Sequence, residues 1–218
     1  MFRSPVNLTA LLHTVFITDG LGDEARIDWL LESVLAGGIR AVQLREPSLA
    51  TEALLALGRR WMPRFDALGA ALLINDRVDV ALAGAAHGVH LKQASLSPVA
   101  VPGEALWVGR SVHGLEDIAA SRAAHYLHLA PLFPTSCKPG AAHLGVEAAR
   151  AVLSRVVQPV VLLGGINLEN VEQARGIGAT GVAVMSAICG AGDPCSVARQ
   201  LVATRGAFRQ AEHEAGVL

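Results

Sequence analysis

The chain has 218 residues, 52% of them hydrophobic, and its 18 basic side chains nearly balance its 19 acidic ones. This length allows one domain with a sizeable core, and the even charge argues against nucleic acid or a membrane surface as a partner. No stretch approaches the roughly 18 apolar residues that span a bilayer, and the first residues form a poor signal peptide. Three cysteines that match no zinc spacing suggest a reducing compartment. We therefore expect a cytoplasmic protein, and a homo-oligomer is compatible with the sequence.

Short apolar stretches alternate with longer amphipathic ones along the chain, a pattern typical of strands that are followed by helices. Eight strands are predicted, over residues 13–18, 39–45, 70–75, 88–91, 106–112, 126–132, 160–165 and 180–186. Helices are predicted over residues 23–38, 50–69, 77–85, 114–124, 145–157, 167–179 and 193–205. Residues 92–105 break the pattern, because prolines fall where a helix is expected.

The predicted strands are apolar along most of their length, which indicates burial on both faces, as in a parallel sheet. Eight repeats without a Pro/Gly/Ser-rich linker predict a single α/β domain, a (β/α)8 TIM barrel over residues 1–218. We expect residues 1–12 to be an N-terminal extension and residues 207–218 to be a flexible C-terminal tail. A doubly wound open sheet is the alternative, but no GxGxxG motif follows the first strand.

Functional residues of such a barrel lie at the carboxyl ends of its strands. After the seventh strand, Gly164 and Gly165 permit a tight turn whose N–H groups can face an anion. After the eighth strand, Met185 and Ser186 stand where a helix can begin. Loops at these two places often hold a phosphate, so these four residues are the candidate phosphate site. The alternative is that the glycines only pack a strand against a helix.

Polar side chains also end the second and third strands. Gln43 and Arg45 share one face by the two-residue period of a strand. An arginine at a barrel mouth needs an anionic partner, either a ligand phosphate or carboxylate or an internal salt bridge. Asn75 and Asp76 follow the third strand, where Asp76 either caps the next helix or contacts a ligand or metal.

The loop after the sixth strand offers a further set of donors. Thr135 and Ser136 provide hydroxyls and Lys138 a cation, which together suit a phosphate or carboxylate, although an ordinary surface loop has the same composition. Cys137 lies in this candidate substrate-binding stretch, but no base is placed to make it a nucleophile.

Ser111 and His113 end the fifth strand, in the stretch "GRSVHG". By the strand period they share one face, with Ser111 as a hydrogen-bond partner of His113. An imidazole titrates near neutral pH and can accept and return a proton, which makes His113 the candidate acid/base residue. A surface turn is the alternative for this stretch.

These motifs together resemble the thiamine-phosphate synthase and thiazole tautomerase superfamily, over most of the chain. The resemblance rests on "VQLRE", "LLINDRVDVALAGAAHGVHL", "GRSVHGLEDI", "LAPLFPTSCKPGAAHLG", "VVLLGGINLENV" and "GVAVMSAI". It implies a small (β/α)8 barrel that binds a thiazole phosphate.

The synthase branch of the superfamily joins hydroxymethylpyrimidine diphosphate to a thiazole phosphate, with magnesium. Its pattern Gln-x-Arg-Glu-Lys after the second strand ends here in Pro47. Its magnesium site combines the aspartate that Asp76 matches with another in "HLGQxD", but here the stretch reads "HLKQAS", with Lys92 and Ser95 in place of glycine and aspartate. A single carboxylate makes a poor magnesium site.

The stretches "GRSVHGLED", "CKPG" and "AVMSAI" are in the style of the thiazole tautomerases. The resemblance thus favours an isomerase that aromatises a thiazole carboxylate phosphate, with His113 as proton shuttle and no metal or organic cofactor. Two alternatives remain: a synthase, for which Asp76 would bind Mg²⁺, and a non-catalytic regulatory protein that binds thiazole phosphate or thiamine phosphate. The residues expected to bind substrate are Gln43, Arg45, Asn75, Ser111, Thr135, Ser136, Cys137 and Lys138.

Overall fold

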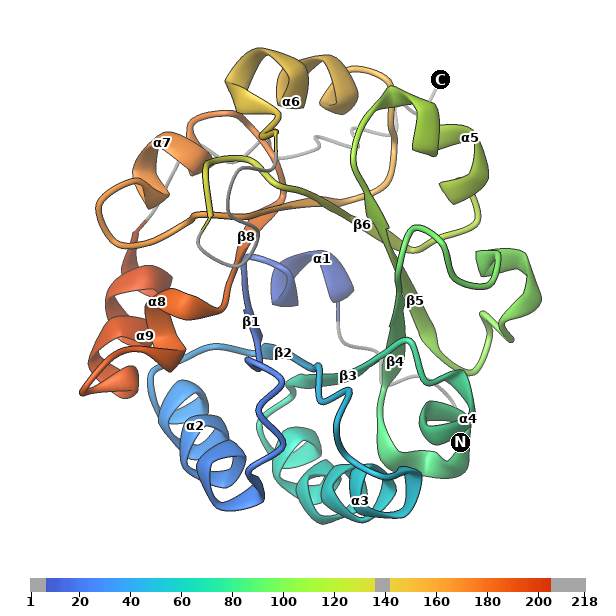
Figure 1. Ribbon diagram of the computed structural model, residues 1–218, viewed down its shortest axis with the longest axis vertical. Coiled ribbons are helices and arrows are strands. Elements are labelled where there is room, and N and C mark those ends of the chain that lie inside the picture. Colours follow the sequence, from blue (N-terminus) through green and yellow to red (C-terminus); the bar gives the residue numbers. More distant parts are fainter. Residues whose placement is uncertain (1–6, 136–141, 205–218) are drawn as a thin grey trace, which may run out of the picture.

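Eight parallel strands close into a barrel in the computed structural model, which describes residues 7–135 and 142–204. Each strand pairs with the next along the chain, and β8 pairs with β1. Helices surround the ring of strands (Figure 1), so the predicted (β/α)8 barrel is confirmed. The strands are β1 (Thr14–Ile17), β2 (Ala41–Leu44), β3 (Ala71–Asn75), β4 (Gly88–Leu91), β5 (Trp107–Val112), β6 (Tyr126–Leu129), β7 (Val160–Leu163) and β8 (Gly181–Val184).

The outer helices follow the predicted amphipathic stretches. For example, the side chain of Asp23 accepts a hydrogen bond from the Arg26 amide at 3.1 Å and so caps the first long helix. The α-helices are α1 (Leu8–Leu11), α2 (Glu24–Ala36), α3 (Thr51–Ala67), α4 (Val78–Val80), α5 (Ile118–Ser121), α6 (Gly145–Leu153), α7 (Val171–Arg175), α8 (Ser186–Cys189) and α9 (Pro194–Ala203). Shorter or irregular turns are η1 (Ala81–Ala85), η2 (Pro98–Ala100) and η3 (Leu115–Asp117). No described helix has the length and apolar character that crossing a membrane requires.

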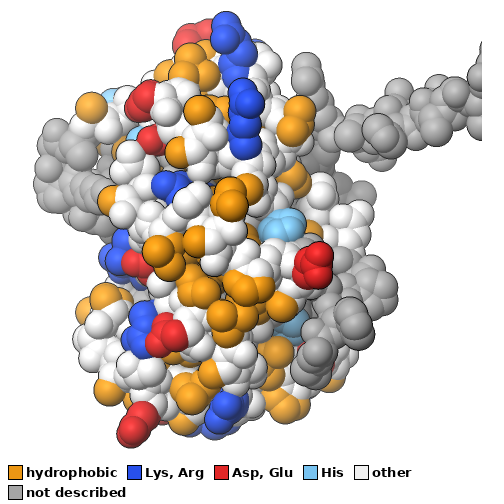
Figure 2. Space-filling model, turned by 90° about the vertical axis from the view of Figure 1, so that its right-hand side faces the viewer, with side chains coloured by type: hydrophobic (Ala, Val, Ile, Leu, Met, Phe, Trp, Pro, Cys, Tyr) orange, Lys and Arg blue, Asp and Glu red, His pale blue; other side chains and the backbone are white. Residues whose placement is uncertain are grey.

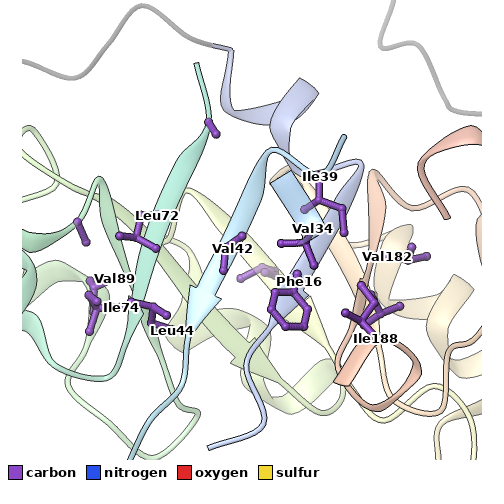
Figure 3. Packing of buried hydrophobic residues seen from close by; sticks show 14 of the residues in the cluster. Phe16, Val34, Ile39, Val42, Leu44, Leu72, Ile74, Val89, Val182 and Ile188 are labelled. Carbon is purple, nitrogen blue, oxygen red and sulfur yellow. The ribbon is translucent and has the colours of Figure 1, made fainter. Parts of the chain in front are cut away.

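Strand side chains alternate between two hydrophobic layers. On β3, Leu72 and Ile74 face the helices, and Figure 3 shows them in one layer with Phe16 and Val42 from β1 and β2. Leu73, between them in sequence, belongs to the cluster inside the barrel. Burial of a leucine or isoleucine contributes about 2 kcal/mol, so both layers stabilise the ring and hold the strand ends in place.

The N-terminal end of the barrel is covered by α1, which crosses the middle of the ring in Figure 1. Leu11 and Leu12 join the cluster inside the barrel, together with Val15 and Trp107 at the start of their strands. The residues just before β1 therefore pack as part of the domain and leave the opposite end of the barrel open for a site.

The connection between β4 and β5 contains only the single turn η2 among its described elements. This agrees with the sequence of residues 92–105, in which prolines fall where a helix is expected. Figure 2 views the side of the barrel that carries α4 and α5, and shows hydrophobic side chains gathered at its middle among scattered charged ones. In this connection Leu96 and Val99 are 59% and 79% exposed, because one short turn cannot cover them as a full helix would.

Candidate functional site

A pocket of about 270 Å³ opens at the carboxyl ends of the strands, between the loops that follow β6, β7 and β8. It includes Thr135, Gly165 and Ser186, which the sequence analysis assigned to substrate or phosphate binding, while Gly164 and Met185 adjoin it in sequence. The full lining is Pro134, Thr135, Gly165, Ile166, Asn167, Ser186 and Ala187.

The two glycines after β7 allow this pocket to form. Gly164 and Gly165 have φ values of +106° and +67°, in the region that L-residues with side chains disfavour. A Cβ atom on Gly165 would collide with the carbonyl oxygen of Pro134 and lie 2.9 Å from the Cβ of Phe133. Only glycine therefore lets the loops after β6 and β7 approach this closely.

Backbone amides without an acceptor among the described residues lie in the loops that form this pocket. Asn170 donates to the carbonyl of Gly165 at 2.8 Å and so fixes the turn after β7. In the described part of the chain the N–H groups of Gly165 and Ile166 have no hydrogen-bond acceptor. The first N–H groups of α8, which begins at Ser186, likewise have no partner within their helix. Such a group of free N–H donors suits a phosphate.

A layer of polar side chains lies below the mouth of the barrel. Gln43 donates to the side-chain oxygen of Asn75 at 2.9 Å, which confirms that these two residues lie together. On the next strands, His90 contacts the hydroxyl of Ser111 at 3.0 Å and that of Tyr126 at 3.2 Å. The layer can therefore present amide, hydroxyl and imidazole groups to a heteroaromatic ring.

His128, on β6, was not identified from the sequence, although its two-residue spacing from Tyr126 predicts that it faces inward. Its ring lies 4.1 Å from that of His90, and within the described residues neither of its nitrogens has a hydrogen-bond partner. Burial lowers the pKa of His90 from 6.5 to about 3. Burial and the neighbouring His90 also lower the pKa of His128, so both rings are neutral at pH 7.

His113 lies apart from this layer. Its Nδ1 is 2.7 Å from the carbonyl oxygen of Ala130, which can only accept, so Nδ1 carries the proton. Asp117 accepts a hydrogen bond from the His113 amide at 2.7 Å, and the imidazole is exposed. The expected contact with Ser111 was wrong: β5 ends at Val112, so the strand period no longer governs His113, and Ser111 bonds His90 instead.

Charged residues follow β2, β3 and β4 on the opposite side of the mouth. The amide of Arg45 donates to Thr18 Oγ1 at 2.9 Å, while its guanidinium is exposed and forms no hydrogen bond or ion pair within residues 7–135 and 142–204. Asp76 forms an ion pair with Lys92, with 2.6 Å between Oδ2 and Nζ. Arg45 therefore forms no internal salt bridge with any described residue. The ion pair at this side of the mouth joins Lys92 and Asp76 instead.

Asp76 does not cap a helix, because both of its carboxylate oxygens have other partners. Lys92 binds Oδ2, and the hydroxyl of Ser95 donates to Oδ1. Burial alone would raise the pKa of Asp76, but the hydrogen bonds from Lys92 and Ser95 outweigh it and lower the pKa. The carboxylate is therefore ionised and fully engaged at neutral pH.

These contacts do not fit a magnesium ion held by the protein. A divalent cation at Asp76 would have to displace an ammonium group and would meet a hydroxyl where the superfamily pattern has a second carboxylate. Within the described ranges, no three His, Cys, Asp or Glu side chains come together as a metal site. Ser136, Cys137 and Lys138 lie outside the described residues.

The sequence family described as thiamine monophosphate synthase matches residues 14–188. The chain belongs to this family. It is 37% identical to the thiamine-phosphate synthase of Archaeoglobus fulgidus over 88% of this chain and 92% of that protein. It is 42% identical to a putative thiamine-phosphate synthase of Geobacter sulfurreducens, over 80% and 84% of the two chains. A solved thiamine phosphate pyrophosphorylase of Pyrococcus furiosus superposes with a TM-score of 0.79 and 32% identity, over 89% of this chain and 96% of that one.

These relatives overturn the prediction of a thiazole tautomerase. The superfamily was correctly identified, but the similar proteins named above are synthases, or transferases, rather than isomerases. The prediction failed because departures from the synthase pattern, at Pro47, Lys92, Ser95 and Cys137, were weighed as losses of the synthase site. The role of His113 as a proton shuttle depended on isomerisation and has no support once that reaction is removed.

Proposed function

We propose that the protein is a thiamine-phosphate synthase, which joins hydroxymethylpyrimidine diphosphate to thiazole phosphate. In this reaction the thiazole nitrogen forms a bond to the methylene carbon of the pyrimidine substrate. The bond from that carbon to the diphosphate oxygen breaks, and its electron pair leaves with the diphosphate. The enzyme must therefore hold two phosphorylated substrates with their reacting atoms adjacent and stabilise the leaving group.

The observation that carries this proposal is the pocket at Gly165 and Ser186, in a chain that shares 37% identity with a named synthase over most of both lengths. The pocket suits the phosphate of the thiazole. On the far side of the ring, where β3 stands opposite β7, Arg45 and Lys92 suit the diphosphate. Gln43, Asn75 and Ser111 lie between these anion sites and would orient the pyrimidine and thiazole rings of the substrates.

Thiamine phosphate formation tests the proposal directly. The purified protein is incubated with both substrates, with and without magnesium, and the product is measured by its oxidation to a fluorescent thiochrome. We expect product that depends on both substrates. Isomerisation of a thiazole carboxylate phosphate, or tight binding of thiazole phosphate without any product, would contradict the proposal and point to the other activities of the superfamily.

His113 provides a second test, because the condensation written above transfers no proton. We expect His113→Gln to keep kcat within about threefold of the wild-type value, whereas loss of a general acid or base costs about a hundredfold or more. Steady-state kinetics at saturating concentrations of both substrates measure this. A hundredfold loss of kcat in a variant that melts like the wild type would show that His113 acts on the reacting atoms.

A further inference from the structure

The ion pair between Asp76 and Lys92 occupies a defined place at the mouth of the barrel. Asn75 on β3 is paired in register with His90 on β4, so the residues that follow these two strands lie side by side. The Lys92 side chain is 62% exposed and the Asp76 side chain 22% exposed. The ammonium group thus has N–H donors directed to solvent at the mouth while one contact holds it to the carboxylate.

We propose that Lys92 is a built-in counter-charge for the diphosphate of the pyrimidine substrate, at the place where Asp76 would otherwise help to hold a divalent cation. This inference rests on the proposed synthase function. It assigns a substrate-binding role to a lysine that the superfamily pattern does not contain. It also predicts that diphosphate binds at this site without a metal ion held by the protein.

Hydrogen bonds hold the loop that carries Lys92 and Ser95, and so keep the Lys92 ammonium group in a defined position. The buried guanidinium of Arg110 donates to the carbonyls of Gln93 and Leu96, at 2.6 and 2.9 Å. The amide of Ser95 donates to the carbonyl of Lys92 at 3.1 Å, which closes a turn. These bonds place the Ser95 hydroxyl on one oxygen of Asp76 and the Lys92 ammonium on the other.

The charges at this side of the mouth favour an anion over a cation. Arg45 and Lys92 are both exposed, whereas Asp76 is partly buried and paired with Lys92, and the carboxylate of Glu46 beside Arg45 is buried. A divalent cation would be repelled by both basic groups, whereas the diphosphate would be attracted by both. As the carbon–oxygen bond breaks, negative charge builds up on the diphosphate, and a prepositioned ammonium group stabilises it.

Binding of inorganic pyrophosphate to the full-length protein tests the proposal without turnover. Calorimetric titrations in the presence of a chelator compare the wild type with Lys92→Gln, Lys92→Arg and Arg155→Gln. Arg155 is an exposed cation that precedes β7, at the other end of the barrel, and serves as the matched control. We expect affinity to fall about tenfold or more in Lys92→Gln, to stay within about threefold in Lys92→Arg and to be unchanged in Arg155→Gln.

A double variant, Lys92→Gly with Ser95→Asp, restores the pair of carboxylates. Electron paramagnetic resonance with Mn²⁺ alone is expected to show binding about tenfold tighter or more in this variant than in the wild type. Its pyrophosphate binding should require Mn²⁺. Thermal melts confirm that each variant is folded, and Lys92→Arg distinguishes loss of charge from loss of structure.

The proposal is overturned if wild-type protein binds pyrophosphate only with Mn²⁺, or if Lys92→Gln binds it as tightly as the wild type without metal. Failure of the proposed function has a different signature, since no thiamine phosphate would form with or without magnesium. In that case the pyrophosphate and Mn²⁺ titrations still decide the role of Lys92.

Discussion

Replacement of Gly165 by alanine is expected to raise the KM for thiazole phosphate about a hundredfold and to destabilise the protein by about 3 kcal/mol. The added methyl group would collide with the Pro134 carbonyl, and the residue would keep a φ of +67° that alanine disfavours. The loops after β6 and β7 must then separate, which displaces the amides of the phosphate pocket. Steady-state kinetics and urea unfolding measure the two effects.

Gly178→Ala is the matched control for this variant. Gly178 also has a positive φ, +95°, but a Cβ atom there would meet nothing within 4 Å. This substitution should cost about 1–2 kcal/mol of stability through backbone strain alone and leave the KM for thiazole phosphate unchanged. If Gly165→Ala binds thiazole phosphate as well as Gly178→Ala does, the pocket at Gly165 is not the phosphate site.

Acid is expected to destabilise the protein through the two histidines inside the barrel. Burial lowers the pKa of His90 from 6.5 to about 3 and lowers that of His128 as well, whereas in the unfolded chain both have a pKa of about 6.5. The unfolded state therefore binds more protons below neutral pH. The stability that these groups contribute is fully present above about pH 6.5 and is lost as the pH falls toward 3.

Between pH 7 and pH 5 the loss from His90 alone is about 2 kcal/mol, because it contributes about 1.4 kcal/mol per pH unit once its unfolded form is protonated, and His128 adds to this loss in the same direction. His128→Leu should reduce the loss to about 2 kcal/mol and retain stability at pH 7, since neither nitrogen of His128 has a partner in the described chain. Urea unfolding at several pH values measures this. Replacement of the exposed His143 by leucine is the control. If the free energy of unfolding changes equally with pH in the wild type, His128→Leu and His143→Leu, the buried histidines do not cause the loss of stability.

The positions of the candidate site residues around the barrel could be predicted from the sequence. The spacing of the apolar strands predicts the ring. The ring brings Gly165 and Ser186 to one pocket although 20 residues lie between them in the sequence. Gln43 and Asn75 were likewise expected at this end and form a hydrogen bond there. These predictions needed only strand order and the direction of the chain.

Contacts between side chains of different loops could not be predicted in this way. The sequence shows Lys92 and Ser95 only as departures from a family pattern, whereas the structure brings both of them to Asp76. A lost carboxylate and a gained lysine are two defects when each is considered separately, but side by side they give Asp76 an ammonium and a hydroxyl partner. Because these contacts depend on distances across two loops, the sequence alone led to the wrong branch of the superfamily.

The most direct test of the central claim is the stoichiometry of the condensation. Thiamine phosphate and inorganic diphosphate are measured in the same reaction, with purified protein and equal amounts of the two substrates. We expect one diphosphate to be released for each thiamine phosphate formed, and neither product when either substrate is omitted. Diphosphate release without thiamine phosphate, or no reaction of the two substrates at all, would contradict the proposed function.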